Sequence, residues 1–213
     1  MEADQAILLR VQYNMTRRSF SQFTLADALA LVDRRLLDLW TLSVTPRPAT
    51  PFFLERLQRL EVFDTARSEA GKLLIVDAFF EEALQPYRHQ LRTFKEASLV
   101  GDQASGAVDY LVTPASLVPT TPLLCVAEAK KDDFEKGLAQ CLVELHTCAQ
   151  INAGKDHRVP VFGIVTNGTS WQFYRRTVEG VISESLPYGL ANQELLLGVL
   201  DYLFAQCVQN LPT

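Results

Sequence analysis

Two carboxylates and one ammonium have the spacing in this sequence that most strongly indicates chemistry. Asp109 stands in the segment GAVDYLV, and Glu128 and Lys130 stand in LLCVAEAKK. Because alternate residues of a strand share a face, Glu128 and Lys130 point the same way if this segment is extended. The residues between Asp109 and Glu128 are enough to turn at 114–122 and to lay two strands side by side. Carboxylate and carbonyl oxygens suit Mg²⁺ or Mn²⁺, so the pattern indicates a hard cation and an anionic substrate.

The same triplet also has a plainer interpretation. A glutamate and a lysine two residues apart on a strand often form only a surface ion pair, worth under about 1 kcal/mol. The elements around the triplet therefore decide between a surface pair and a site. After residue 90 the hydrophobic spacing changes from helical to alternating, which predicts strands at 91–100, 107–113 and 123–130.

Helices and further strands are expected on both sides of these three strands. In chain order they are a helix from Ser68 to about Leu84, a helix over 133–152, a buried strand over 159–167, a turn at Asn167-Gly168, a strand over 170–176 and a helix over 192–209. The resulting order, α-β-β-β-α-β-β-α, predicts an α/β fold. We expect a short mixed central sheet flanked by helices, with a C-terminal helix.

Residues 1–62 are expected to form a helical N-terminal extension to a main domain over 63–213. An amphipathic helix is predicted over 24–40, with Thr24 as its N-cap. The proline-rich segment 45–51 shows no periodicity and is expected to be a linker. Thr50 and Pro51 then have the types of an N-cap and a first helical residue, which predicts a helix to about Val62.

Composition limits the classes of protein that this chain can represent. Its 213 residues, of 23.9 kDa, are 48% hydrophobic and 21% charged, as in ordinary globular domains. Twenty basic and twenty-five acidic residues give a formal net charge of −5. Because a chain that coats DNA by bulk charge is normally basic, any nucleic-acid contact is expected to be confined to a local patch.

Cysteine usage and hydropathy indicate a cytoplasmic protein without membrane association. The four cysteines show no C-x-x-C spacing and lie in apolar or helical stretches, which predicts free buried thiols in a reducing compartment. No signal peptide is recognised before the domain. No apolar run reaches the roughly 18 residues that a membrane span needs.

Five segments together resemble the PD-(D/E)xK nuclease superfamily, which has the restriction endonuclease-like αβββαβ core. They are SEAGKLLIVDAFFEEAL, SGAVDYLV, CVAEAKK, GLAQ and VFGIVTNGTSWQFYR. The nearest likeness is to the N-terminal nuclease domain of type I restriction motor subunits and its stand-alone relatives. The resemblance covers about half of the chain, 65–176. Val108 stands where the superfamily name has proline, and Glu144 stands where some branches carry tyrosine.

The resemblance implies a metal-dependent nuclease that hydrolyses DNA. Its catalytic centre would consist of Glu69, Asp109, Glu128, Lys130 and Gln140. Asp109, Glu128 and the carbonyl oxygen of Ala129 would ligate Mg²⁺ or Mn²⁺, which would activate a water. Lys130 would orient that water or stabilise the transition state. Glu69 would complete a second metal position or position the water, and it is equally a favourable first-turn helix residue.

Nucleic-acid contacts and partners are less sharply indicated. The candidate phosphate contacts are Lys131, Arg175 and Arg176, with Arg17-Arg18 beside them, although a run of charges is usually a solvated face. The implied partner is DNA, held through a local patch, with a homodimer formed through 1–62 or a partner protein as further candidates. The alternative to an enzyme is a catalytically silent nuclease-fold module that binds or regulates within a restriction, defence or DNA-processing complex. The presence of Asp109, Glu128 and Lys130 together favours retained chemistry.

Overall fold

A mixed β-sheet forms the centre of the computed structural model, which describes residues 17–65, 67–129 and 133–212. Its strand order is β1-β4-β5-β6-β7-β8-β2, with β3 paired to β4 and β9 paired to β7. β5 and β6 are parallel, as are the short pairs β1–β4 and β2–β8, whereas the other pairs are antiparallel. The strands are β1 Arg18–Ser19, β2 Asp38–Leu39, β3 Leu91–Val100, β4 Ala104–Pro114, β5 Cys125–Ala129, β6 Val161–Thr166, β7 Ser170–Arg176, β8 Ile182–Glu184 and β9 Tyr188–Gly189.

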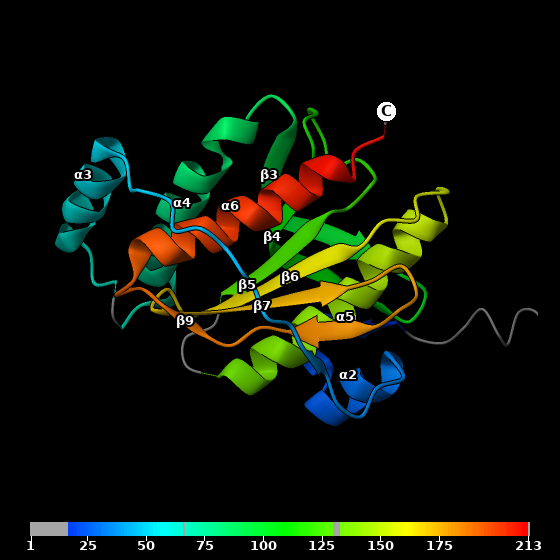
Figure 1. The fold of residues 1–213 in the computed structure, drawn as a ribbon. Helices are drawn as coiled ribbons and strands as arrows, with labels where there is room; N and C mark the ends of the chain where they lie inside the picture. Colours follow the sequence, from blue (N-terminus) through cyan, green and yellow to red (C-terminus); the bar gives the residue numbers. More distant parts are fainter. Residues whose placement is uncertain (1–16, 66, 130–132, 213) are drawn as a thin grey trace, which may run out of the picture.

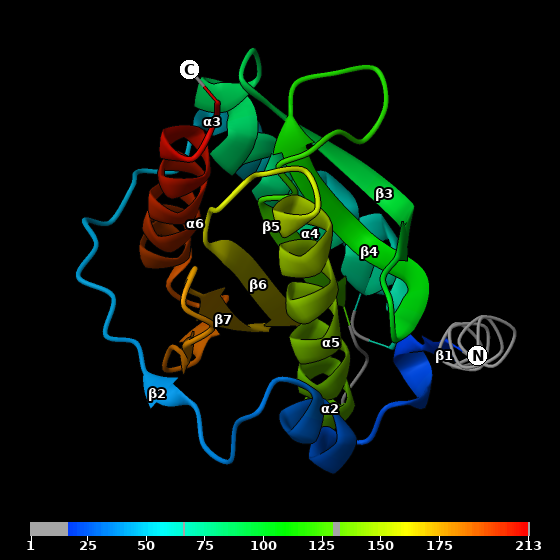
Figure 2. The ribbon, with the colours of Figure 1, turned by 90° about the vertical axis from the view of Figure 1, so that its right-hand side faces the viewer.

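Helices cover both faces of this sheet (Figures 1 and 2). They are α2 Leu25–Leu31, α3 Pro51–Arg59, α4 Glu69–Leu84, α5 Phe134–Ala153 and α6 Gln193–Gln209, with short 3₁₀ turns at Phe20–Gln22, Leu60–Val62 and Gln85–Tyr87. α4 and α6 pack on one face, which we call the α4–α6 face, and α5 with α2 packs on the other, the α5 face. The predicted α/β fold with a mixed central sheet flanked by helices is confirmed.

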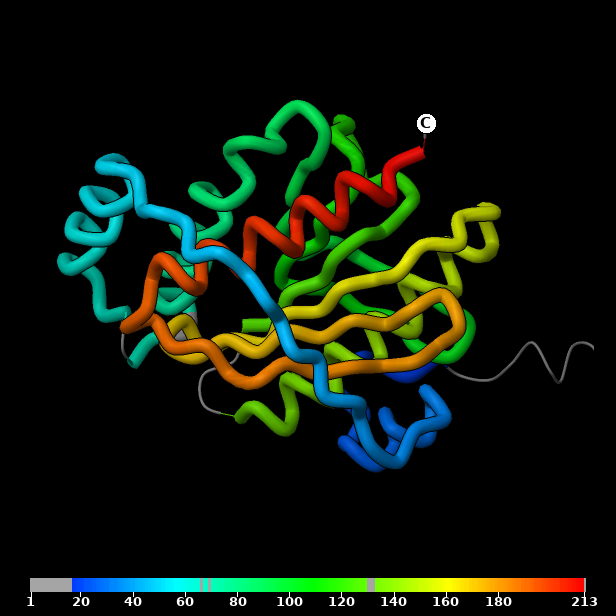
Figure 3. The backbone as a smooth tube through the Cα atoms, in the orientation of Figure 1, coloured from blue at the N-terminus to red at the C-terminus, as the bar shows by residue number. Residues whose placement is uncertain are grey.

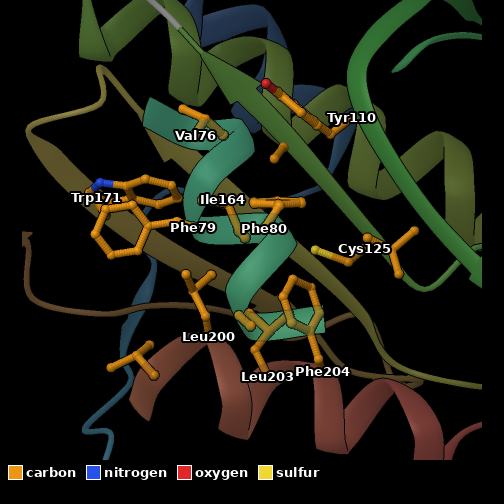
Figure 4. Packing of buried hydrophobic residues seen from close by; sticks show 14 of the residues in the cluster. Val76, Phe79, Phe80, Tyr110, Cys125, Ile164, Trp171, Leu200, Leu203 and Phe204 are labelled. Atoms are coloured by element: carbon orange, nitrogen blue, oxygen red, sulfur yellow. The ribbon is translucent and has the colours of Figure 1, made fainter. Parts of the chain in front are cut away.

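Two hydrophobic clusters hold these layers together, one on each face of the sheet. On the α4–α6 face, Phe79 contacts Trp171 with ring centroids 5.4 Å apart, and Phe80 contacts Phe204 at 5.5 Å. Figure 4 shows these rings between the two helices and the strands. Trp171 and Phe173 are both fully buried and form part of this packing.

Local capping signals set where the long helices begin. The Ser68 hydroxyl accepts from the Gly71 N–H at 3.2 Å, and the Thr50 hydroxyl accepts from the Phe53 N–H at 3.2 Å. The Asp133 carboxylate accepts from the Lys136 N–H at 2.9 Å in the same way. Each bond satisfies a backbone donor that the first turn leaves unpaired. These helices therefore start where the sequence predicts, and α5 and α6 also end within a residue of the expected positions.

The helix predicted over 24–40 is wrong beyond its first two turns. α2 ends at Leu31, and Asp33 takes a positive φ of 53° that turns the chain away from the helix. Arg34 then donates to the Gly180 carbonyl at 2.9 Å, and Asp38 and Leu39 pair with β8 as β2. A helix continued to 40 would forgo these long-range contacts.

The segment 40–50 runs from β2 across the front of the strands toward α3 (Figure 3). The Trp40 N–H donates to the Glu184 carbonyl at 2.6 Å, and the Arg47 N–H donates to the Glu194 carbonyl at 2.9 Å. The segment lies so close to α6 that a Cβ placed on Gly198 would sit 2.3 Å from the Thr45 carbonyl oxygen. Although irregular, as predicted for 45–51, this stretch is tied to the main domain at both ends. The boundary at residue 62 between an N-terminal extension and a main domain stays a prediction.

Candidate metal and nuclease site

The pairing of β4 with β5 ends where the two candidate metal ligands stand. Backbone pairs join Val112 to Cys125, Leu111 to Val126 and Tyr110 to Ala127. The next position in this register places Asp109 opposite Glu128. Residues directly opposite one another in an antiparallel pair have Cβ atoms about 4.5–5.5 Å apart. The predicted pairing of these two strands is thus confirmed, and a close approach of the two carboxylates follows from this register as a prediction.

At this point a hydrogen bond to the Asp109 side chain replaces the backbone pairing of β4 with β5. Its Oδ2 accepts from the Ala129 backbone N–H at 2.8 Å, so a side-chain bond follows the last backbone pair. This bond fixes one oxygen of the Asp109 carboxylate against the end of β5. The structure therefore brings together Asp109, Glu128 and Ala129, the three predicted metal ligands.

A change of face in the β3–β4 hairpin occurs at the same level. The register passes from Lys95–Tyr110 to Ala97–Val108, with no pair formed at Glu96 and Asp109, and Glu96 has a positive φ of 52°. Tyr110 belongs to the cluster on the α4–α6 face, whereas Val108 belongs to the cluster on the α5 face. Asp109 stands at this twist, which accounts for a side chain that reaches sideways to β5.

Glu128 lies on the α5 face and is almost completely buried. Its neighbours Ala127 and Ala129 belong to the opposite cluster, and its own exposed fraction is 1%. Burial raises the pKa of the Cys141 thiol on α5, and the charges of Glu144 and Glu128 raise it further. Glu128 therefore lies beneath α5 and close to the Cys141 thiol, where water is largely excluded.

Helix α4 lies across the other face at the same end of the sheet. The strand end at Ala129 pairs with Thr166, and the turn that follows Thr166 contains Gly168. A Cβ on Gly168 would lie 3.5 Å from the Lys72 carbonyl oxygen and 3.6 Å from the Lys72 Cβ. The first turns of α4 thus reach the end of β5 and β6, and Glu69 is the first residue of that helix.

Several predicted site residues lie outside the described part of the chain. They are Lys130 and Lys131, and the side chain of Glu69. Within the described residues no group of three or more His, Cys, Asp or Glu side chains could hold a metal ion. The described part of the site is accordingly a pair of carboxylates with one backbone carbonyl, a donor set of hard oxygens.

Gln140, predicted to support the site, is buried on α5 with an exposed fraction of 6%. Glu144 follows it by one turn and is fully buried as well. Both residues lie on the helix that covers Glu128. The structure therefore places Gln140 in the layer that contains the candidate site, along with a second acidic side chain.

Arg175 and Arg176 do not lie beside the carboxylates. Arg175 pairs with Phe162, which pairs with Cys125 at the start of β5, whereas Glu128 is near its end. With about 3.3 Å per residue and 4.8 Å per strand, the Cα atoms of Glu128 and Arg175 are roughly 14 Å apart. The two arginines therefore do not border the carboxylate pair, and contact of either with a DNA phosphate stays a prediction.

Arg17 and Arg18 are also engaged within the chain. The Arg17 Nε donates to the Gly101 carbonyl at 2.8 Å. The Arg18 guanidinium pairs with Asp27 at 2.9 Å and lies over the Phe23 ring. Both side chains stabilise the fold around β1, which weakens the idea that they form a basic patch.

Two buried charged residues near the candidate site were not predicted from the sequence to belong to it. Lys72 has an exposed fraction of 6% in α4, and Glu144 is fully buried in α5. The signal for both is a single charge surrounded by apolar residues on a helix, in GKLLIV and in CLVELHTC. Such charges are almost never fully buried without a partner, so this pattern points to an interior polar network.

A membrane-spanning role finds no support in the helices that the structure describes, none of which combines the length and apolar character of a bilayer span. All four cysteines are free and buried, as predicted.

Comparison with known proteins gives partial similarities. No family model matches the chain. Crinkler effector protein 1 of Rhizophagus irregularis is 29% identical over 111 residues, which are 49% of this chain and 23% of that protein. Crinkler effector protein 5 of Phytophthora infestans is 31% identical over 88 residues, which are 40% of this chain and 23% of that protein. The chain thus matches less than a quarter of the length of either relative.

Proposed function

We propose that this protein is a Mg²⁺-dependent nuclease of the PD-(D/E)xK type that hydrolyses DNA phosphodiester bonds. The observation that carries the proposal is the end of the β4–β5 ladder, where Asp109 stands opposite Glu128 and bonds to the Ala129 N–H at 2.8 Å. The order of helices and strands around this point agrees with the αβββαβ core of that superfamily.

The donor set fits Mg²⁺ or Mn²⁺. Mg²⁺ is usually held by one or two carboxylates and keeps several waters, so Asp109, Glu128 and the Ala129 carbonyl are sufficient. When bound, the metal would lower the pKa of a coordinated water and offset charge that develops on the phosphate. The bond from the Ala129 N–H fixes the Asp109 carboxylate, and the cover of α5 keeps bulk water away from Glu128.

The remaining residues have roles that extend from this arrangement. Lys130 follows Glu128 by two positions, and we assign it the orientation of the attacking water. Glu69, at the start of α4, is assigned to the same water or to a second cation. Gln140 is assigned to support of Glu128 from α5.

Substrate binding must overcome an acidic surface. The net charge is −5, and the arginines at 175 and 176 lie at the other end of the sheet. Bound cations would offset the local carboxylates, and Lys131 remains the candidate phosphate contact beside the site. We therefore propose weak binding of DNA by the isolated chain, strengthened by metal, a dimer or a partner protein. Free buried thiols suit a reducing compartment, and we propose a cytoplasmic location.

The similar proteins are described as effectors, a word that names no chemistry. The proposal therefore rests on the geometry of the carboxylates and needs a direct test. Purified full chain is incubated with supercoiled plasmid and with single-stranded DNA, in Mg²⁺, Mn²⁺ or EDTA. The variants are Asp109→Asn, Glu128→Gln and Lys130→Met, with the exposed Asp102→Asn as the matched control.

Metal-dependent cleavage is expected from wild type and from the control. Because removal of residues that only orient a metal ligand costs about 10–100-fold, loss of a direct ligand should lower the rate by at least about 100-fold. Equal cleavage by all the variants would show that the activity belongs to a contaminant. Divalent-metal binding that Asp109→Asn abolishes, without any cleavage by wild type, would replace the enzyme with the catalytically silent module.

A further inference from the structure

A cavity of about 190 Å³ lies on the α4–α6 face, between the 40–50 segment, the strands β6 and β7, and α6. Its lining includes Trp40, Phe162, Arg175, Glu179, Tyr202 and Gln206. We call it the Arg175 cavity. Figure 3 shows the 40–50 segment crossing in front of the strands, with α6 above it. The cavity thus combines an aromatic wall with a small number of polar groups, as binding sites for small molecules do.

Arg175 is the unusual member of this lining. Its side chain is half-buried, its Nε is fully buried, and Nε has no hydrogen-bond partner in the part of the chain that the structure describes. Among those residues no carboxylate lies within ion-pair distance of the guanidinium either. A guanidinium carries five donors in a planar fork, and a buried polar group without a partner is unfavourable. No hydrogen bond joins its Nη atoms to the described residues either, and these outer donors are the ones that an acceptor from outside the chain can reach.

The guanidinium is held in place by the rings around it. Its Cζ lies 4.9 Å from the centroid of the Trp40 ring, and Trp40 stacks on Phe162 at 6.1 Å with an interplanar angle of 25°. The Trp40 backbone is in turn fixed by its bond to Glu184. An arginine pre-positioned on an aromatic face loses little conformational freedom when it binds a ligand.

The chemistry of this lining selects an oxyanion. An arginine fork binds carboxylate or phosphate oxygens in pairs, which gives both energy and orientation. Tyr202 and Gln206 add side chains that can donate from α6. Glu179 is the carboxylate in the lining, and its hydrogen bond from Thr177 helps to hold it. It favours ligands that carry a hydroxyl or amino group near the anionic group.

We propose that the Arg175 cavity binds a small molecule through its phosphate or carboxylate group, with Arg175 as the anion-binding residue. This site is separate from the carboxylate pair. Arg175 shares a face of β7 with Trp171 and Phe173, which belong to the cluster on the α4–α6 face, whereas Glu128 lies on the α5 face. The proposal therefore stands or falls independently of nuclease activity.

Tryptophan fluorescence gives a direct readout. The chain has two tryptophans, of which Trp171 is fully buried in the core and Trp40 lies under the Arg175 guanidinium. Full-length protein is titrated with inorganic phosphate and, separately, with acetate, at constant ionic strength. The variants are Arg175→Gln and Arg175→Lys. Arg176→Gln is the matched control, because its side chain lies on the opposite face of β7.

A saturable change in emission is expected with phosphate, acetate or both, and the anion that binds identifies the source of the oxyanion. Affinity should fall at least about tenfold in Arg175→Gln and should be unchanged in Arg176→Gln. Arg175→Lys keeps the positive charge but lacks the planar fork, so its affinity should lie between those of wild type and Arg175→Gln. This variant also provides the test if Arg175→Gln fails to fold. Absence of saturable binding with either anion, or equal affinity in both Arg175 variants and wild type, would overturn the proposal.

Discussion

Replacing Asp109 should separate its structural contribution from its proposed chemistry. Asp109→Ala removes the acceptor of the Ala129 N–H, a bond of 2.8 Å to a buried donor. A hydrogen bond to a charged group contributes about 1.5–3 kcal/mol, and because Asp109 is half-buried we expect a loss of about 1–2 kcal/mol. Asp109→Asn keeps a neutral oxygen at the same position, so its loss should be smaller, about 0.5–1 kcal/mol.

Urea unfolding followed by circular dichroism measures these losses, with EDTA present so that metal binding does not contribute. The urea midpoint should be lower in Asp109→Asn than in wild type and lowest in Asp109→Ala, while the slope of the unfolding free energy against urea stays constant. The exposed Asp102→Asn variant controls for general charge effects. An unchanged midpoint in Asp109→Ala, or an Asn variant as unstable as the Ala variant, would show that the bond to Ala129 does not stabilise the sheet.

Three further predictions concern the rest of the fold. Gly198→Ala places a Cβ 2.3 Å from the Thr45 carbonyl oxygen and should cost about 1–3 kcal/mol in urea unfolding. Burial, and secondarily the charge of Arg176, lowers the pKa of His146 below 6.5, so the unfolded chain takes up the proton first. Stability should therefore fall as the pH drops below about 6.5. The four buried thiols should react with a thiol reagent only after unfolding, since burial also raises the pKa of each.

Each of these three predictions has a control variant or a result that would contradict it. Gly189→Ala, where a Cβ would meet no atom within 4 Å, should leave the midpoint nearly unchanged, and an equal loss at both glycines would contradict the packing argument. His146→Gln should flatten the pH dependence, whereas the exposed His89→Gln should not. Rapid modification of the native thiols would show that the core opens far more often than its packing implies.

Elements with local signals could be predicted from the sequence. Ser68, Thr50 and Asp133 each have a side chain that accepts from the first turn, so the starts of three helices are encoded within four residues. The strands of the central sheet have apolar alternation or continuous apolar runs. The order of elements and the layers on both faces follow from these local patterns.

Long-range pairing explains what the sequence could not predict. The helix expected to reach residue 40 ends at Leu31 because β2 pairs with β8, nearly 150 residues away. β8 and β9 are three and two residues long, too short to show a period. The change of face at Glu96 depends on a backbone conformation that glutamate rarely adopts, so no pattern of residue types signals it.

In the candidate site, too, local sequence signals predicted some features and long-range contacts decided the others. Asp109 and Glu128 could be paired in advance because two adjacent strands carry them, and the register of β4 and β5, continued by one position, places them opposite one another. The bond from Ala129 to Asp109 and the burial of Glu128 beneath α5 required the structure. Arg175 and Arg176 are adjacent in sequence, yet alternation sends them to opposite faces of β7, away from the carboxylates.

Binding of Mn²⁺ is the most direct test of the claim that Asp109 and Glu128 form a metal site. Electron paramagnetic resonance of full-length protein titrated with Mn²⁺ separates bound ion from free ion. We expect stoichiometric binding by wild type and by Asp102→Asn, and loss of binding in Asp109→Asn and Glu128→Gln. Mn²⁺ that stays free in the presence of wild type, or that binds both variants as tightly as wild type, would contradict the account.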